Sequence, residues 1–397
     1  MIFCFPLCQA DSLLMPYNFE TFNSVAEVPF EQWQRMVPAN NLMFQFSYLK
    51  HLEENQQGNM RFKYVLVRQN EALMGVAYFQ VVQFSGTQLS NYHAESSIVN
   101  RIKDWVLPLI KVEMLVGANL LMTGEKGFYC KTGISETDMA DMYLQVVQHI
   151  FKSETQIGAF LMTDIFETDS VLRQKFEAEG FHPIYEEPDM KMQLRPEWKS
   201  IDDYLNSISS KYRVRAKKCM ALSGSLVRKN LSEQEVKNFE PNIYRLYKNT
   251  IAKSTFNLFE LQPGFFAEQK QLFGERYMVF GYFLNDKLVG FNSLYCNQKS
   301  GEVHYIGLDY EVNKKHHTYQ RMLYDMVECG IEQQFARLHF GRTASEIKST
   351  VGAVPVTVNG ILKHRNFIVN SIIIKPLAAA IKPKDFVFRN PFKDTVA

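Results

Sequence analysis

The first half of the chain is dominated by short apolar segments with the alternation of β-strands. Residues 63–82 carry β-branched and aromatic side chains on both sides of a polar turn at 69–71, which predicts a β-hairpin. Residues 137–153 have apolar positions at helical spacing and predict an amphipathic helix. The other elements predicted in this half are strands at 111–123, 157–165 and 190–194, and helices at 30–36, 46–54, 101–107 and 168–179.

The second half repeats this order of elements. Residues 70–76 (NEALMGV) are echoed by residues 285–291 (NDKLVGF), each at the turn of an extended hairpin, with an offset of 215 residues. Because a similar segment recurs at the same place in the same order of elements, the chain is predicted to contain a tandem repeat. The elements predicted in the second copy are strands at 276–283, 288–296, 302–308 and 336–340, and a helix at 315–335.

Length and composition indicate two packed domains. The chain has 397 residues, of which 46% are hydrophobic and 22% charged, so it holds enough apolar material for two cores. Pro196 interrupts the last strand of the first copy, and polar residues follow it. The predicted division is an N-terminal tail at 1–16, a first domain at 17–196 and a second domain at 197–397, with Met15 as an alternative start of the chain.

Charge and cysteine usage narrow the classes of function. The chain has 44 basic and 42 acidic residues and a net charge of +2, so contact with a polyanion has to come from local patches. Six cysteines are scattered without a Cys-x-x-Cys pair, which favours reduced thiols in a cytoplasm over a disulfide framework or a metal site. No stretch reaches 18 apolar residues, so a transmembrane segment is not expected.

The stretch at 338–352 is the first candidate site. Gly341 ends a predicted strand, and Arg342 and Lys348 then supply a planar guanidinium and a mobile ammonium beside the hydroxyl of Ser345. Donors of this kind suit a phosphate or a carboxylate. The alternative interpretation is a solvated loop that carries two basic residues.

Three short motifs within this stretch carry a resemblance to a known family. Residues 340–343 (FGRT), 346–348 (EIK) and 351–352 (VG) resemble the signature that closes the acyltransferase domain of the FemAB-like group in the GNAT superfamily, which includes aminoacyl-tRNA-dependent peptidoglycan transferases. Residues 210–218 (SKYRVRAKK) are similar to the basic segment that opens the second domain of these proteins. The resemblance implies an α/β (α+β) fold of two tandem GNAT-like domains, each a mixed, mostly antiparallel sheet flanked by helices.

The same resemblance leaves the acyl donor open. Many GNAT proteins hold the pyrophosphate of coenzyme A in a glycine-rich loop at a helix N-terminus. The corresponding place in the second copy, residues 313–321 (NKKHHTYQR), has no glycine. Gly124, Gly127 and Gly133 in the first copy do not have the spacing of the loop and also fit a simple turn. No cofactor is therefore firmly implied, and acyl-CoA and aminoacyl-tRNA are both candidate donors.

A basic segment is the second candidate site. Residues 204–232 contain seven Lys or Arg residues and no Asp or Glu. If residues 210–220 are helical, Lys211, Arg215 and Lys218 share one face, and Arg213 lies between them in sequence. This row of charge suits the phosphates of tRNA, of a nucleotide-linked precursor or of a lipid headgroup. The alternative is an ordinary solvated helix face.

Four residues of the predicted strand at 302–308 and its end are candidates for acid–base chemistry. Alternation puts Tyr305 and Asp309 on one face, and Glu302 and His304 on the other. Asp309 is favoured because it lies at the end of the strand, with Tyr305 on the same face, whereas His304 in mid-strand is more typical of a structural histidine.

These observations lead to a hypothesis about function. The chain is expected to be an enzyme that transfers an activated acyl or aminoacyl group to an amine acceptor, with a role in peptidoglycan or lipid synthesis for the cell envelope. Lys348 and Arg342 would hold an anionic group of a substrate. The alternatives are a noncatalytic module that binds anions or nucleic acid, and an ordinary acetyl-CoA-dependent N-acetyltransferase.

Overall fold

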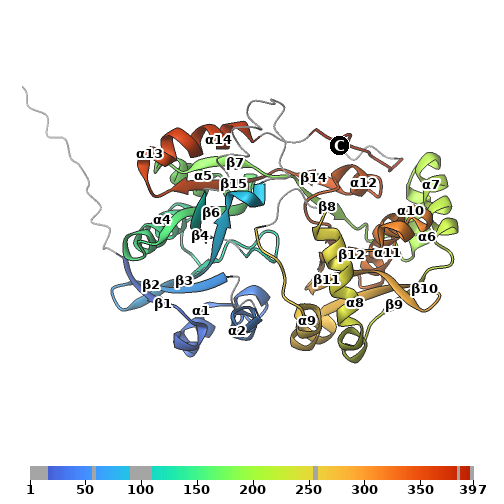
Figure 1. The fold of residues 1–397 in the computed structure, drawn as a ribbon, viewed down its shortest axis with the longest axis horizontal. Coiled ribbons are helices and arrows are strands. Elements are labelled where there is room, and N and C mark those ends of the chain that lie inside the picture. The colour runs from blue at the N-terminus through green and yellow to red at the C-terminus, as the bar shows by residue number, and fades with distance from the viewer. Residues whose placement is uncertain are drawn as a thin grey trace, which may run out of the picture.

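Two β-sheets stand side by side in the protein, each with helices packed against it (Figure 1). The computed structural model describes residues 17–55, 60–89, 110–117, 119–253, 258–381 and 385–393. The predicted N-terminal tail and the predicted helix at 101–107 lie outside these residues. The predicted α/β class is confirmed.

The first sheet has the strand order β1-β2-β3-β4-β6-β15-β7, with β5 paired to β3. Strand β4 runs parallel to β6, and the other neighbours are antiparallel. Helices α4 and α5 pack on one face, and α1 and α2 pack on the other. The bounds are β1 Tyr17–Phe22, α1 Phe30–Met36, α2 Phe46–Asn55, β2 Met60–Gln69, β3 Ala72–Ser85, β4 Lys111–Val116, β5 Phe128–Cys130, α4 Glu136–Ser153, β6 Ile157–Phe166, α5 Ser170–Ala178, β7 His182–Tyr185 and β15 Val358–His364.

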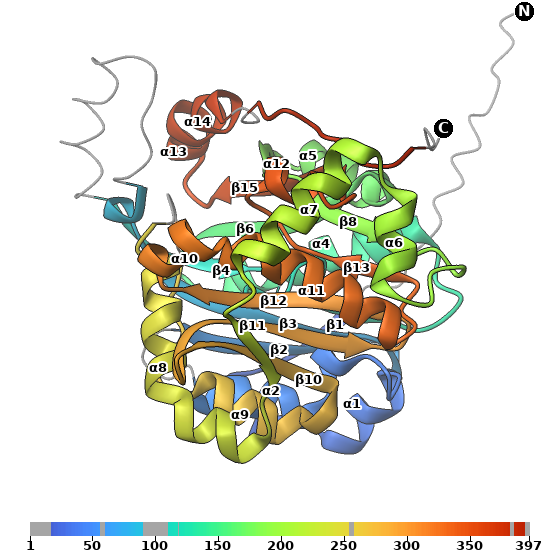
Figure 2. The same ribbon diagram turned by 90° about the vertical axis from the view of Figure 1, so that its right-hand side faces the viewer.

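The second sheet has the order β14-β8-β13-β12-β11-β10-β9. Strand β12 runs parallel to β13, and the other neighbours are antiparallel. Helices α6, α7 and α11 cover one face, and α8 and α9 cover the other (Figure 2). The bounds are β8 Asp189–Gln193, α6 Ile201–Ser207, α7 Ser210–Leu222, β9 Val227–Asn230, α8 Glu233–Ile251, α9 Phe265–Phe273, β10 Tyr277–Leu284, β11 Lys287–Asn297, β12 Ser300–Leu308, α10 Tyr310–His316, α11 Thr318–Glu332, β13 Arg337–His339, α12 Ser345–Ser349 and β14 Val354–Val356.

Three helices begin at a serine whose hydroxyl satisfies a free backbone N–H. Ser135 accepts a hydrogen bond from the Asp138 N–H at the start of α4. Ser200 and Ser232 do the same at α6 and α8, where an acidic residue three positions on bonds back to the backbone of the serine. Such caps stabilise a helix by about 1 kcal/mol each, so the local sequence sets where these helices begin.

The predicted tandem repeat is confirmed by the positions of the two hairpins. Strands β2 and β3 are the second and third strands of the first sheet, counted from β1, and β10 and β11 are the second and third strands of the second sheet, counted from its β9 edge. Both turns contain an asparagine in the left-handed region, Asn70 with φ 53° and Asn285 with φ 47°. Asparagine tolerates this conformation better than most residues, which explains its recurrence.

The two sheets exchange one strand each. Each sheet and the helices packed on it form one unit. Strand β8 follows the first unit in the chain, but it inserts between β13 and β14 of the second sheet. Strand β15 comes from the second unit and inserts between β6 and β7 of the first sheet. The expectation that residues 190–194 close the first unit is therefore wrong, because their backbone partners lie in the second. The domain limits 17–196 and 197–397 stay a prediction, and the sheets cross this division at β8 and β15.

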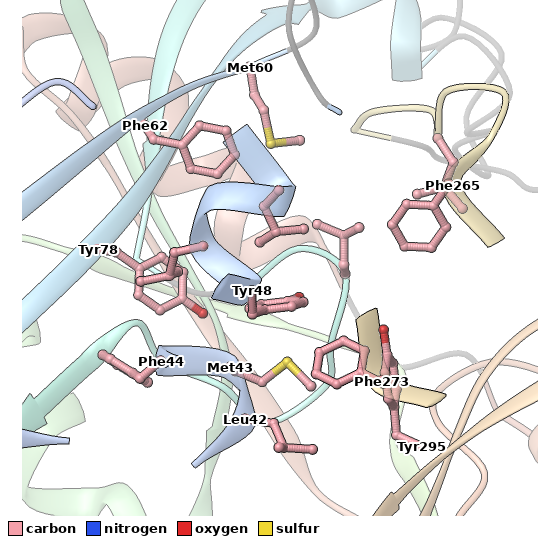
Figure 3. Close-up of a cluster of buried hydrophobic side chains, with 14 of the residues drawn as sticks. Leu42, Met43, Phe44, Tyr48, Met60, Phe62, Tyr78, Phe265, Phe273 and Tyr295 are labelled. Carbon is pink, nitrogen blue, oxygen red and sulfur yellow. The ribbon is translucent and has the colours of Figure 1, made fainter. Parts of the chain in front are cut away.

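An apolar core joins the two units (Figure 3). Tyr48 of α2 lies with its ring centre 5.7 Å from that of Phe273 of α9, and Phe273 is 5.3 Å from Tyr295 of β11. All three side chains are buried. Because the contact removes several aromatic rings from water, the units are expected to hold a fixed relative position.

Two predicted elements have different limits in the structure. The helix predicted at 315–335 is two helices, α10 and α11, because His317 between them adopts a left-handed conformation with φ 51°. The strand predicted at 111–123 ends at Val116. The next residue, Gly117, lies so close to Tyr143 that a Cβ there would be 2.6 Å from the tyrosine oxygen, and the chain turns away. Among the described residues, no helix has the length and apolar character needed to cross a bilayer.

Candidate functional site

A pocket of about 250 Å³ opens between the two units. The first unit lines it with the loop before α2 and the loop after β4, and the second unit lines it with β11, β12 and β13. The exchanged strand β8 completes the wall. The titratable residues along the lining, apart from one tyrosine, are Glu125, Asp189, Lys191, Glu302 and His339.

Four lining residues form one row across adjacent strands. The register places Glu302 of β12 opposite Tyr295 of β11 on one side and opposite His339 of β13 on the other. His339 is in turn opposite Lys191 of β8. Because residues directly opposite one another on neighbouring strands project from the same face, the register brings these side chains together. Lys191 reaches this row because β8 is inserted into the second sheet.

The charges along this row are only partly paired. His339 Nδ1 lies 3.3 Å from Glu302 Oε2 and 3.9 Å from Asp189 Oδ2. Lys191 Nζ is 3.3 Å from Asp189 Oδ2 and 4.0 Å from the centre of the Phe166 ring. Asp189 is 1% exposed, yet neither of its carboxylate oxygens accepts a hydrogen bond within the described part of the chain. Buried carboxylate oxygens are normally satisfied, so this one is available to a ligand.

Burial shifts the pKa values of Glu302 and His339, the two central residues of the row, in opposite directions. It raises the pKa of Glu302 to about 7, and the negative charge of Asp189 acts in the same direction. It lowers the pKa of His339 to about 4, with help from the charges of Lys191 and Arg337. His339 is therefore neutral near pH 7, whereas Glu302 exchanges a proton there. A carboxyl group with a pKa near the working pH is suited to general acid–base catalysis.

The first unit contributes a second carboxyl group of this kind. Burial raises the pKa of Glu125, in the loop after β4, to about 7, and the Gly127 N–H lies 3.3 Å from its Oε1. Three carboxyl groups, Glu125, Asp189 and Glu302, therefore face the pocket with one ammonium, that of Lys191. This balance favours a ligand with a positive charge.

His304 fixes the position of the loop that carries Glu125. Burial lowers the pKa of His304 to about 3, so the ring is neutral. Its Nε2 lies 2.9 Å from the Leu121 carbonyl oxygen, and its Nδ1 lies 3.3 Å from the Tyr277 hydroxyl. A neutral ring that donates at Nε2 and accepts at Nδ1 satisfies both contacts. His304 thus joins β12 to the loop of the other unit.

The residues favoured for catalysis from the sequence lie away from this pocket. Tyr305 is packed among aromatic rings, with Tyr247 at 5.6 Å and Phe266 at 6.0 Å between ring centres, and burial raises its pKa. Asp309 caps α10, where its carboxylate accepts hydrogen bonds from the N–H groups of Glu311 and Val312. Neither residue lines the pocket. Their catalytic roles stay predictions.

The predicted anion site at 342–348 is internally paired. The Arg342 guanidinium lies 2.9 Å from Glu186 Oε1 and 3.7 Å from Asp164 Oδ1. Lys348 is buried in α12, and its Nζ donates to the carbonyl oxygens of Gly341 and Arg342 at 3.0 and 2.7 Å. Burial lowers the Lys348 pKa to about 7. Ser345 is buried at the start of the same helix. Substrate binding by these residues stays a prediction.

The basic segment is helical in the structure, where it forms α7. Lys211, Arg215 and Lys218 are exposed along it, in agreement with a face of positive charge. Arg213 points elsewhere: its guanidinium donates to the carbonyl oxygens of Leu205 and Ile208 at the end of α6, at 3.0 and 3.1 Å. That contact is structural. None of the four lines the pocket.

Four titratable members of the pocket are not predicted from the sequence: Glu125, Asp189, Lys191 and His339. The strand predicted at 190–194 is expected to close the first unit, so the approach of Lys191 and of the preceding Asp189 to β13 does not follow from the sequence. The sequence analysis favours Asp309 over Glu302. An aspartate directly before a helix is a common N-cap, and this signal would have reversed the ranking.

Comparisons with known proteins bear on the fold. No family model and no curated protein matches the sequence. Among solved structures, FemX matches with a TM-score of 0.53 and 13% identity over 89% of this chain and 99% of that chain. A tandem GNAT protein from the clavulanic acid biosynthesis pathway matches with a TM-score of 0.49 and 8% identity over 88% of this chain and 99% of that chain. L-PGS from Bacillus licheniformis matches with a TM-score of 0.46 and 8% identity over 83% and 94%.

At these identities a structural match shows shared architecture. The match to FemX covers most of both chains, so the shared architecture extends beyond a single sheet. The resemblance drawn from the motifs at 340–352 and 210–218 is therefore confirmed at the level of the fold: the chain has two tandem GNAT-like units.

Proposed function

We propose that the protein is an acyltransferase whose amine acceptor binds in the pocket between the two units, with Glu302 as the general base. The observation that carries the proposal is the row of Glu302, His339 and Lys191 beside the unsatisfied carboxylate of Asp189. The fold shared with FemX supports the class of reaction.

The charge of the pocket fits the state in which an amine arrives. An aliphatic amine is an ammonium ion at neutral pH, and it cannot attack a carbonyl until it loses a proton. Asp189 and Glu125 attract the ammonium, and the Glu302 carboxylate accepts one of its protons. The pKa of about 7 lets Glu302 be ionised in a large share of molecules and still hold the proton.

The bond changes follow from this proton transfer. The free nitrogen attacks the activated carbonyl carbon, so that a nitrogen–carbon bond forms. The bond from that carbon to the oxygen of an ester or the sulfur of a thioester then breaks. The proton held by Glu302 passes to the leaving group, and the ionised Glu302 then takes the second proton from the nitrogen, which becomes the amide N–H, and releases that proton to water. His339, 3.3 Å from Glu302 and neutral, orients the carboxylate without adding a charge.

The finer proposal concerns the donor and the pathway. The exposed cations Lys211, Arg215 and Lys218 on α7 support a donor or acceptor that carries phosphates, such as aminoacyl-tRNA or a nucleotide- or lipid-linked precursor of the cell envelope. Changing all three to Glu is expected to abolish salt-sensitive retention on immobilised tRNA. Unchanged retention would contradict this part of the proposal.

Exchange of Glu302 for Gln tests the catalytic role. The purified protein is incubated with a panel of primary amines and with acetyl-CoA or aminoacyl-tRNA, and amide products are measured by mass spectrometry. Glu302→Gln keeps the shape of the side chain and removes the base, so turnover is expected to fall by about 10²-fold or more. The matched control Glu71→Gln, at the exposed turn after β2, is expected to keep wild-type turnover. Wild-type turnover in Glu302→Gln would overturn the assignment.

A further inference from the structure

An apolar surface remains exposed near the C-terminal end of the described chain. It belongs to a helical segment formed by α13 (Phe367–Val369), the π-turn η7 (Asn370–Ile374) and α14 (Lys375–Ala380). Phe367 is 81% exposed, Ile368 65% and Ile372 69%, and Ile373 and Leu377 are also exposed. Single exposed apolar residues are ordinary, but five within eleven positions mark an interaction surface.

The opposite side of this segment is anchored to the protein. Asn370 is buried and donates to the Gly180 carbonyl oxygen at 2.9 Å, and its side-chain oxygen accepts from the His364 N–H at 2.9 Å. The small side chain of Ala378 is also buried. The segment therefore turns polar and small residues inward and large apolar residues outward, which is the reverse of an ordinary surface helix.

The exposed apolar side chains lie in and around the π-turn. Ile372 and Ile373 are within it, Phe367 and Ile368 precede it in α13, and Leu377 follows it in α14. Figures 1 and 2 show α13 and α14 at the edge of the molecule beside β15.

The charge around this surface is positive. Lys375 is exposed within the segment, and Lys363 is partly exposed at the end of β15. Lys363 Nζ donates to the Glu179 carbonyl oxygen, and the Glu179 carboxylate lies near it. Arg365 is directed inward to carbonyl oxygens after α4. From residue 347 to residue 384 the sequence contains no Asp or Glu.

We propose that this segment attaches the protein to the surface of an anionic phospholipid bilayer, with Phe367, Ile368 and Ile372 entering the acyl boundary and Lys375 meeting the headgroups. A segment of this length lies in the plane of the interface and does not span it. Charge complementarity favours an anionic bilayer over a second copy of this protein, because two copies of the surface would bring like charges together. The proposal is independent of the acyltransferase function.

Sedimentation with vesicles tests the attachment. The full chain is mixed with vesicles of phosphatidylcholine alone or with about 30 mol% phosphatidylglycerol, and the bound fraction is measured at low and high salt. Binding is expected with the anionic vesicles and is expected to weaken in high salt. The variant Phe367→Ser/Ile368→Ser/Ile372→Ser is expected to lose roughly tenfold or more of the partition coefficient, and Lys375→Glu about fivefold.

A matched control removes exposed apolar side chains elsewhere. Val214→Ser/Val227→Ser changes residues that are 66% and 64% exposed and is expected to bind like the wild type. Equal binding of the wild type and the triple variant, or no binding of the wild type to anionic vesicles, would overturn the proposal. So would a dimer in light scattering that the triple variant converts to a monomer without any vesicle binding, because a second copy would then be the occupant.

Discussion

Two charged clusters lie beside the stretch at 338–352, and they differ in how their charges are satisfied. In one cluster Arg342 is paired with Glu186 and Asp164, and the carbonyl oxygens around Lys348 accept its hydrogen bonds. In the other, along the row from Glu302 to Lys191, Asp189 has no hydrogen bond from the described residues. In the first cluster Asp164 still accepts a hydrogen bond from the Thr163 hydroxyl at one of its two oxygens, whereas neither oxygen of Asp189 accepts one from the described residues. The first cluster is therefore the more nearly satisfied of the two.

This difference separates a structural role from a catalytic one. A buried charge whose partners are all in place stabilises the surrounding loop and has little left to offer a substrate. A buried carboxylate that has an ion pair but no hydrogen bond, as Asp189 does, costs free energy, which the proposed chemistry would explain. In the proposed mechanism, therefore, the motif that draws attention in the sequence supports the site, while less conspicuous residues on β8, β12 and β13 form it.

Variants in the two clusters test whether their roles differ. The largest effect is expected in Arg342→Met, as a loss of stability. The variant leaves Glu186 and Asp164 buried without their cation, so the free energy of unfolding is expected to fall by about 2–4 kcal/mol. Chemical denaturation measures it. Arg389→Met removes the exposed pair with Glu346 and is expected to cost less than about 1 kcal/mol. Equal losses in the two variants would show that the Arg342 cluster is not structural.

Glu302→Gln, unlike Arg342→Met, is expected to increase the free energy of unfolding, and the increase is expected to depend on pH. The folded-state pKa of Glu302, about 7, lies above its ordinary value, so the folded protein holds the proton more tightly and loses stability as pH rises between about 4.5 and 7. Glutamine removes this loss. The variant is expected to gain about 1–3 kcal/mol relative to wild type at pH 8 and little at pH 4. Thermal melts across this range, with Glu71→Gln as control, check it, and a pH-independent difference would contradict it.

The smallest effect on stability is expected in Lys348→Met. Two hydrogen bonds to carbonyl oxygens are lost, which lowers the free energy of unfolding, but a buried ammonium is also removed, which raises it. The net change is expected to stay within about 1 kcal/mol. Turnover then decides the role. A stable variant with wild-type turnover assigns Lys348 to the structural cluster, whereas a stable variant without turnover supports the substrate-binding role predicted from the motif at 346–348.

Local sequence was enough to predict most of the elements. The hairpins at 63–82 and 276–296 and the helix at 137–153 depend on alternation, turn residues and helical spacing, which act between neighbours in the chain. The exchange of β8 and β15 could not be predicted. Strand β8 carries buried methionines that fit either sheet, and its partners lie far away in the sequence.

The site was less predictable than the fold for the same reason. Glu302 could be named because β12 was predicted, but its raised pKa depends on burial and on the charge of Asp189, which belongs to β8. His339 and Lys191 become neighbours only through the pairing of β13 with β8. The sequence also could not show that Arg342 is neutralised, because Glu186 and Asp164 belong to the other unit.

The exchanged strands also set an order of events during synthesis on the ribosome. In the first sheet, β7 pairs with β15, which is made only after the whole of the second sheet has been translated. At typical rates of translation, β6 and β7 wait roughly 10–30 s for this partner. An unpaired edge is prone to pair with other chains in that interval. The nascent first half is therefore expected to depend on chaperones, and a fragment that ends near residue 196 is expected to aggregate.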